Sequence, residues 1–138
     1  MKTYNPKEVS VIIGSRPLKG FADGTFVKAG RDADAYTKKV GVDGEVTRTK
    51  TNDKSGTIEI TLQQSAEDND YLSSIALTDE LTGAGTVPAL IRDAKGTSLA
   101  TSPAVWVKKL PEMEFGKESG NRAWVFECAI LEMFHGSN

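Results

Sequence analysis

The sequence is poor in the residues that form disulfide bonds and metal sites. Its 138 residues include one cysteine, Cys128, and one histidine, His135. A single cysteine cannot form an internal disulfide, and these two side chains cannot supply the ligands of a structural zinc site. We therefore expect a fold that is held by its hydrophobic core, with no metal and no cofactor.

Residues suited to catalysis are also scarce. Histidine is the commonest acid–base catalyst, and His135 stands close to the end of the chain. A Cys128–His135 dyad is less favoured than a buried strand cysteine beside an exposed terminal histidine. Asp32-Ala-Asp34 lacks the downstream glycine and glutamate of a calcium loop, and Gly83-Ala-Gly85 is too short for a dinucleotide fingerprint. The sequence predicts a protein without catalytic residues, not an enzyme.

Long apolar runs and a one-sided charge are missing as well. No stretch approaches the roughly 18 apolar residues of a membrane-spanning helix, and the start lacks the basic-then-apolar order of a signal peptide. We expect neither a membrane span nor secretion by that route. Seventeen basic residues stand against nineteen acidic ones, which gives a net charge of −2. Electrostatic affinity for nucleic acid is therefore not expected.

Glycine, threonine, valine and isoleucine are plentiful, and they favour strands joined by turns. The length is typical of one domain, here residues 1–138. Alternation and turn residues predict strands at 8–14, 25–28, 36–40, 87–92, 97–100, 104–110 and 122–131. In the last of these, Trp124, Phe126, Cys128 and Ile130 share a face that needs burial.

The segment 45–63 carries the strongest pattern. Two alternating runs flank Asn52–Gly56, which predicts a hairpin in which Thr51 pairs with Thr57. One face of this hairpin is polar and comprises Glu45, Thr47, Thr49, Thr51, Thr57, Glu59, Thr61 and Gln63. The opposite face should pack on the core through Val46, Ile58, Ile60 and Leu62, with the stems of Arg48 and Lys50 near its rim.

One segment has helical spacing. Ser65 is a good N-cap with Asp68 three residues later, and Leu72, Ile75 and Ala76 supply a narrow apolar stripe. This pattern predicts a short helix over about residues 66–77 that packs against a sheet. The chain is therefore expected to be mainly β with one helix.

Several segments resemble the tail tube proteins of contractile-tailed, myovirus-type bacteriophages and prophages. They are Asp43–Gly56, Ile58–Leu62, Gln64-Ser65, Asn69–Leu72 and Gly20-Phe-Ala-Asp-Gly-Thr-Phe26. The resemblance covers the whole chain, and the most specific of the matching segments lie in its first half. The family is similar in architecture to the type VI secretion tube protein. The resemblance implies a β-barrel or sandwich of two packed antiparallel sheets, flanked by one α-helix.

The resemblance also implies a structural role. In that family, hexameric rings stack inside a contractile sheath, and adjacent subunits join their inner sheets into a continuous barrel through which DNA passes. The implied partners are further copies of the chain, the tail sheath protein, and the baseplate and tail-terminator proteins. The tape-measure protein and DNA would occupy the lumen without specific binding. The chain would be made in the host cytoplasm and reside in the virion tail.

Carried onto this sequence, the resemblance makes the polar face of segment 45–63 the candidate lumen wall, where Glu45 and Glu59 would repel phosphate. The candidate inter-ring loop comprises Asn52, Asp53, Lys54 and Ser55, with Arg31–Lys39 as the alternative. Other functions stay open: the tube of a secretion or bacteriocin-like device, or a baseplate or tail-completion protein of the same fold. A monomeric β-barrel that binds a small molecule is less favoured.

Overall fold

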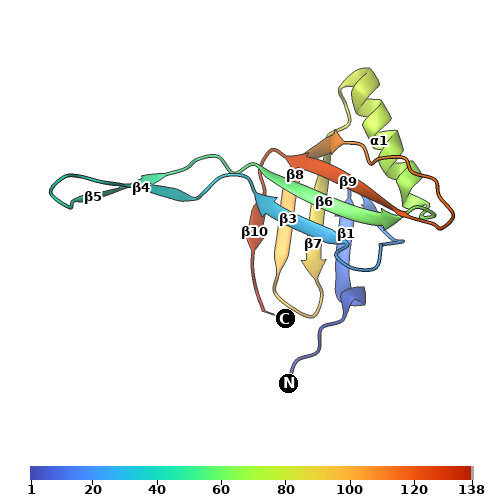
Figure 1. The fold of residues 1–138 in the computed structure, drawn as a ribbon, viewed down its shortest axis with the longest axis horizontal. Helices are drawn as coiled ribbons and strands as arrows, with labels where there is room; N and C mark the ends of the chain where they lie inside the picture. The colour runs from blue at the N-terminus through green and yellow to red at the C-terminus, as the bar shows by residue number, and fades with distance from the viewer. Residues whose placement is uncertain (138) are drawn as a thin grey trace.

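The computed structural model describes residues 1–137 as mainly antiparallel β-structure with one α-helix (Figure 1). The strands are β1 (Val9–Ile13), β2 (Arg16–Pro17), β3 (Val27–Arg31), β4 (Tyr36–Val40), β5 (Val46–Lys50), β6 (Gly56–Gln63), β7 (Val87–Asp93), β8 (Leu99–Lys109), β9 (Asn121–Cys128) and β10 (Glu132–Phe134). A short 3-10 helix, η1 (Pro6–Glu8), precedes β1, and α1 (Asp68–Thr82) joins β6 to β7. The expected class, mainly β with a flanking helix, is confirmed.

Eight strands form one continuous sheet that folds over on itself. Its order is β2-β1-β7-β8-β9-β6-β3, and β10 also pairs with β8. In Figure 1, β3, β6 and β9 cross in front of β1, β7 and β8. Register shifts interrupt the β7–β8 and β8–β9 ladders, and such bulges bend strands sharply. The two packed layers of the expected sandwich are therefore two halves of one sheet.

The core lies between these two layers, and β6 shows how the sequence builds it. Ile58, Ile60 and Leu62 are each 0 % exposed, whereas the residues between them point outward. Ile58 lies opposite Phe126 of β9, and Ile60 lies opposite Trp124. Burying a large apolar side chain contributes about 1.5–3 kcal/mol, so this face of β6 fixes the register of the layer.

The buried face of β9 ends earlier than the alternation predicts. Cys128 is buried, but Ile130 is 44 % exposed, because β9 ends at Cys128 and the chain turns before β10. Leu131 takes the buried place instead. Desolvation raises the pKa of the Cys128 thiol to about 11, so the side chain is a neutral member of the core.

The helix α1 closes one end of the core. Leu72 and Ile75 are buried, as the apolar stripe predicts. Tyr71 donates its hydroxyl hydrogen bond to the carbonyl of Ile13 at 2.8 Å, which ties the helix to β1. The helix runs five residues further than expected, to Thr82, and ends at Gly83 with a left-handed φ of 72°.

The expected N-cap of this helix is wrong. The capping position is Glu67 and not Ser65, and its side chain makes no capping hydrogen bond. Asn69 secures the entry instead, because its amide donates to the carbonyls of Gln63 at 2.9 Å and Ala66 at 3.0 Å. The helix therefore begins at Asp68, slightly later than the pattern suggests.

The predicted hairpin between β5 and β6 is also wrong. β6 pairs with β3 and β9, whereas β5 pairs with β4 in a separate two-stranded sheet that projects from the body of the protein (Figure 1). Thr51 donates its N–H to the carbonyl of Ala35 and does not pair with Thr57. Val46, expected in the core, is 60 % exposed. Two physical causes account for this outcome: the tight turn at 41–45 and the two cations that β5 would have to bury beside Val46.

Candidate functional site

The structure separates the expected lumen-facing residues into two surfaces. Thr57, Glu59, Thr61 and Gln63 lie on the outward side of β6. Glu45, Thr47, Thr49 and Thr51 lie on or beside the β4–β5 sheet, which extends away from β6 in Figure 1. We call the outward side of β3, β6 and β9 the sheet face, and the segment Tyr36–Lys50 the arm.

The sheet face is polar along β6. Glu59 lies opposite Lys28 of β3 and Val125 of β9. The Thr57 hydroxyl donates to a carboxylate oxygen of Asp32 at 3.0 Å, and the Gln63 amide donates to the carbonyl of Phe21 at 3.1 Å. These bonds hold the polar side chains against the sheet, so the face is a fixed polar surface.

The charge of the sheet face is mixed. Lys28 stands beside Glu59, and Glu127 of β9 lies 4.0 Å from the ammonium group of Lys108. A wall made negative by Glu45 and Glu59 together was expected, but Glu45 belongs to the arm. Along β6 the face therefore presents hydroxyls and both signs of charge, whereas β9 contributes the half-buried Val125. Lys28 and Lys108 each lie beside a carboxylate, which disfavours retention of phosphates.

The outer edge of β3 is free, because β3 is the last strand of the sheet. The carbonyl of Phe26 accepts from Thr61, and the N–H of Asp32 donates to Ser55, so backbone groups at even positions face β6. Those of Val27 and Ala29 consequently point to the open side. Such an edge is a template for a strand from another chain.

The arm is solvent-exposed along both strands. Its tip closes through a hydrogen bond from the N–H of Gly41 to the carbonyl of Glu45 at 2.8 Å, and Gly44 adopts a φ of 86° that favours glycine. At its base, the guanidinium carbon of Arg48 lies 4.1 Å from the centre of the Tyr36 ring. The arm is thus a defined hairpin without a core of its own.

The candidate inter-ring loop Asn52–Ser55 lies at the root of the arm. The carbonyl of Lys54 accepts from the N–H of Leu131 at 2.8 Å, and its ammonium group lies 3.7 Å from Glu132 of β10. The hydroxyl and the N–H of Ser55 both donate to Asp53 and lower the pKa of that carboxyl. These contacts hold the loop close to the body, whereas the tip of the arm reaches further out (Figure 1).

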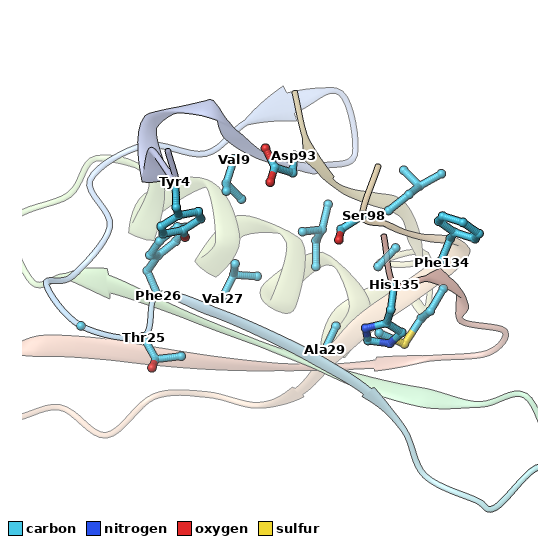
Figure 2. A pocket seen from close by; sticks show the side chains of 15 residues that line it. Tyr4, Val9, Thr25, Phe26, Val27, Ala29, Asp93, Ser98, Phe134 and His135 are labelled. Atoms are coloured by element: carbon cyan, nitrogen blue, oxygen red, sulfur yellow. The ribbon is translucent and has the colours of Figure 1, made fainter. Parts of the chain in front are cut away.

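An apolar groove of about 560 Å³ opens into the core beside the free edge of β3. Figure 2 shows Val27 and Ala29 on one wall, with Tyr4, Phe26 and Phe134 around the opening. Two polar side chains at the groove serve the neighbouring turns: Ser98 donates to the carbonyl of Gly136, and Asp93 accepts from the N–H of Lys95. The groove suits an apolar contact better than it suits a polar ligand.

Within residues 1–137, no three side chains of the metal-binding types gather at one place. In the same range, no helix is long and apolar enough to span a membrane.

Sequence reasoning missed the arm as a unit, although two signals were present. Gly41-Val-Asp-Gly44 is a strong turn sequence, and Arg48 and Lys50 occupy the face that the hairpin prediction assigned to the core. The hydrogen bond between Asn69 and Trp124 was missed as well, because the side chains are 55 positions apart and no local pattern links them.

Comparison with known proteins gives concordant results. Residues 12–136 match the family model described as the bacteriophage PhiTE tail tube protein. The chain is 28 % identical over 144 aligned positions to structural protein ORF10 of Pseudomonas phage KPP10, covering 99 % of this chain and 83 % of that protein. The fold is similar to that of the anti-feeding prophage cap, a tube-terminating protein, with a TM-score of 0.67, 8 % identity and coverage of 97 % and 92 %. It is also similar to the sheath/tube terminator of the extracellular contractile injection system PVC, with a TM-score of 0.62, 12 % identity and coverage of 98 % and 99 %.

Proposed function

Because this chain belongs to the bacteriophage PhiTE tail tube protein family, which is structural and not enzymatic, we propose that it forms hexameric rings that stack into the tail tube. The tube would lie inside a contractile sheath and serve as the conduit for DNA during ejection. The protein would be made in the host cytoplasm and then reside in the virion tail.

The polar sheet face is the observation that carries this proposal. Ile58, Ile60 and Leu62 anchor β6 in the core, so Glu59 and Thr61 must point outward. A continuous wall of such faces around a channel would offer DNA little apolar surface and no concentrated cations. The role of the wall is therefore passive: it allows passage without retention.

The free edge of β3 supports ring closure. An unpaired edge exposes backbone donors and acceptors, and pairing it with a strand of the adjacent subunit would satisfy them. Repetition of this pairing around a ring produces a closed barrel, which has no edges left. The apolar groove beside Val27 and Ala29 lies next to the same edge, so one contact would cover both.

The remaining partners follow from the position of a tube in a contractile tail. The outer surface of the tube would contact the sheath protein, and its two ends would meet the baseplate and the tail terminator. The tape-measure protein and DNA would occupy the lumen without specific contacts. The expected inter-ring loop Asn52–Ser55 lies at the root of the arm, so we assign to the arm the longer reach towards the next ring.

Electron microscopy of the purified protein over a concentration series, with and without tail baseplates as seeds, tests the proposal. We expect stacked rings with a central channel. A strictly monomeric sample in the presence of baseplates contradicts it and favours the isolated small-molecule-binding barrel. Single rings that do not stack favour a tail-completion protein instead. If tubes form and the neighbouring genes encode no capsid protein, a secretion or bacteriocin-like device is favoured.

A variant in which a short glycine–serine turn replaces residues 36–50 tests the role of the arm in stacking. Both strands of the arm are exposed, so their removal leaves the core intact. We expect a folded monomer with an unchanged melting temperature that forms no tubes. Normal tubes from this variant would show that the arm has no role in stacking.

A further inference from the structure

The arm is incomplete as a structural unit. An isolated two-stranded sheet is marginally stable in water at best, and every residue of β4 and β5 is exposed. The exposed set includes Tyr36, Val40 and Val46, which are apolar. These side chains indicate that the arm is completed by a partner that covers one of its faces.

The two faces of the arm differ. The cross-strand pairs Tyr36–Lys50, Lys38–Arg48 and Val40–Val46 share one face, which we call the basic arm face. Lys38 lies directly opposite Arg48, and such like-charge pairs are destabilising. Between Tyr36 and Lys50 the chain carries four cations and two carboxylates, and both carboxylates lie at the tip. The basic arm face therefore combines apolar contact area with uncompensated positive charge.

A complementary surface exists on the same chain. The helix α1 bears Leu77 and Leu81 one turn apart, and they are 56 % and 74 % exposed. Asp70 and Glu80 are exposed on the same side of the helix, since residues 70, 73, 77, 80 and 81 follow one another at helical spacing. We call this stripe the acidic helix face. No lysine, arginine or histidine occurs from residue 55 to residue 91.

We propose that the basic arm face of one subunit docks on the acidic helix face of another copy of the chain; this inference rests on the proposed self-assembly and names its contact. Both surfaces pair exposed aliphatic residues with charges of one sign, and the signs are opposite. Their lengths also agree: a five-residue strand spans about 17 Å and a fifteen-residue helix about 22 Å.

The contact is head-to-tail. In Figure 1 the arm and α1 lie at opposite ends of the molecule, so one subunit cannot satisfy its own arm. A contact between two different surfaces is heterologous, and its repetition generates either a ring or an open stack. Carboxylates beside Lys38 and Arg48 would also relieve the repulsion between these cations. The same contact thus stabilises the arm and links the subunits.

Cross-linking tests the contact directly. We would combine Val46→Cys in the arm with Leu77→Cys in the helix and treat the assembled protein with a short bis-maleimide. Cys128 is 0 % exposed and does not compete. We expect a ladder of covalent multimers from the double variant, and only dimers from a mixture of the two single variants. A ladder that ends at the ring number indicates a contact within rings, and a ladder that continues indicates a contact between rings.

The matched control combines Val46→Cys with Lys95→Cys, which is exposed in the turn between β7 and β8. We expect no ladder from this pair. Visible tubes that give no ladder with the Val46/Leu77 pair overturn the inference and leave the proposed function intact. Absence of assembly, even with baseplate seeds, contradicts the proposed function itself.

Charge exchange provides a second readout that does not depend on cross-linking. Lys38→Glu with Lys50→Glu should lower the assembled fraction about tenfold or more, and so should Asp70→Lys with Glu80→Lys, because each places like charges in contact. The chain that carries all four changes should recover assembly. Circular dichroism confirms that each variant is folded. Loss with the arm changes alone, without recovery in the fourfold variant, shows that the arm docks on a different surface of the neighbouring copy and overturns the assignment to the acidic helix face.

Discussion

Asn69 accepts the indole N–H of Trp124 at 3.0 Å, and the same side chain donates its amide hydrogens to the carbonyls that precede the helix. One residue thus joins β9, the end of β6 and the first turn of α1. Trp124 is 2 % exposed, so water does not replace this acceptor. Together with the Tyr71–Ile13 hydrogen bond and the buried Leu72 and Ile75, this side chain fixes the position of the helix against the folded sheet.

Asn69→Leu should therefore destabilise the protein strongly. It leaves a buried indole N–H without an acceptor and removes the donors at the helix entry, which together should lower the free energy of unfolding by about 2–4 kcal/mol. Asn69→Asp keeps the acceptor for Trp124 but sets a carboxylate oxygen against the carbonyls of Gln63 and Ala66, so it should also destabilise the protein, and it isolates the donor role. Urea denaturation of both variants measures the difference. Wild-type stability of Asn69→Leu would refute the assigned role.

A carboxylate on the two sides of β6 should have opposite consequences. Ile60→Asp places a charge at a position with no exposure, and the resulting penalty of several kcal/mol should prevent folding. Thr61→Asp makes a similar change one residue further along, on the outward side, and should stay within about 1 kcal/mol of wild type. Thermal melts compare the two. Equal melting temperatures would show that the register of β6 is wrong.

The comparison of β5 with β6 shows what the sequence can and cannot predict. Alternation correctly identifies the buried face of β6, because that strand lies between two neighbours and has one dry side. β5 also alternates between two unlike faces, yet Val46, its one apolar residue, is exposed. Period-two patterning reports that a strand has two unlike faces, and it does not report which partner covers either of them. Arg48 and Lys50 were the local sign against burial of β5, because both are charged and lie on the face assigned to the core.

Local sequence patterns could not predict which distant strands pair or where the helix ends. Gly41–Gly44 and Asn52–Gly56 are both plausible hairpin turns, and adjacent runs pair often enough that local patterning favours the wrong one. The helix was placed within a few residues at its start, and its end was underestimated because Leu77 and Leu81 lie outside the stripe that packs on the core. The candidate sheet face was therefore identified only along β6.

A positive charge on the sheet face should impair genome delivery if this face lines the conduit. Glu59→Lys places the new cation opposite Lys28 and converts a mixed region into a positive one, which should retain phosphates. Glu59→Gln removes the carboxylate without adding a cation and should pass DNA almost normally. Ejection rates from virions that carry each variant measure the effect. Normal ejection by Glu59→Lys virions with assembled tails would remove the sheet face from the lumen.

The thiol of Cys128 predicts a specific loss of stability at alkaline pH. Burial raises its pKa to about 11 from an ordinary value of 9.0, so the folded state retains a proton that the unfolded state releases. The resulting stabilisation is fully present below pH 9 and is lost as the pH rises through about 11. Wild type should lose more stability over this interval than Cys128→Ala. Parallel curves for the two proteins would contradict this account.

The placement of the arm and the helix at opposite ends of the subunit gives any filament built from it a direction (Figure 1). Where the arm–helix contact joins one ring to the next, head-to-tail repetition leaves unused arms at one terminus and unused helices at the other. The proteins that start and stop growth consequently contact different surfaces: one binds the basic arm face, and the other binds the acidic helix face with its exposed leucines. Such a filament can be extended from one terminus while it is sealed at the other, and its two end-binding proteins cannot exchange places.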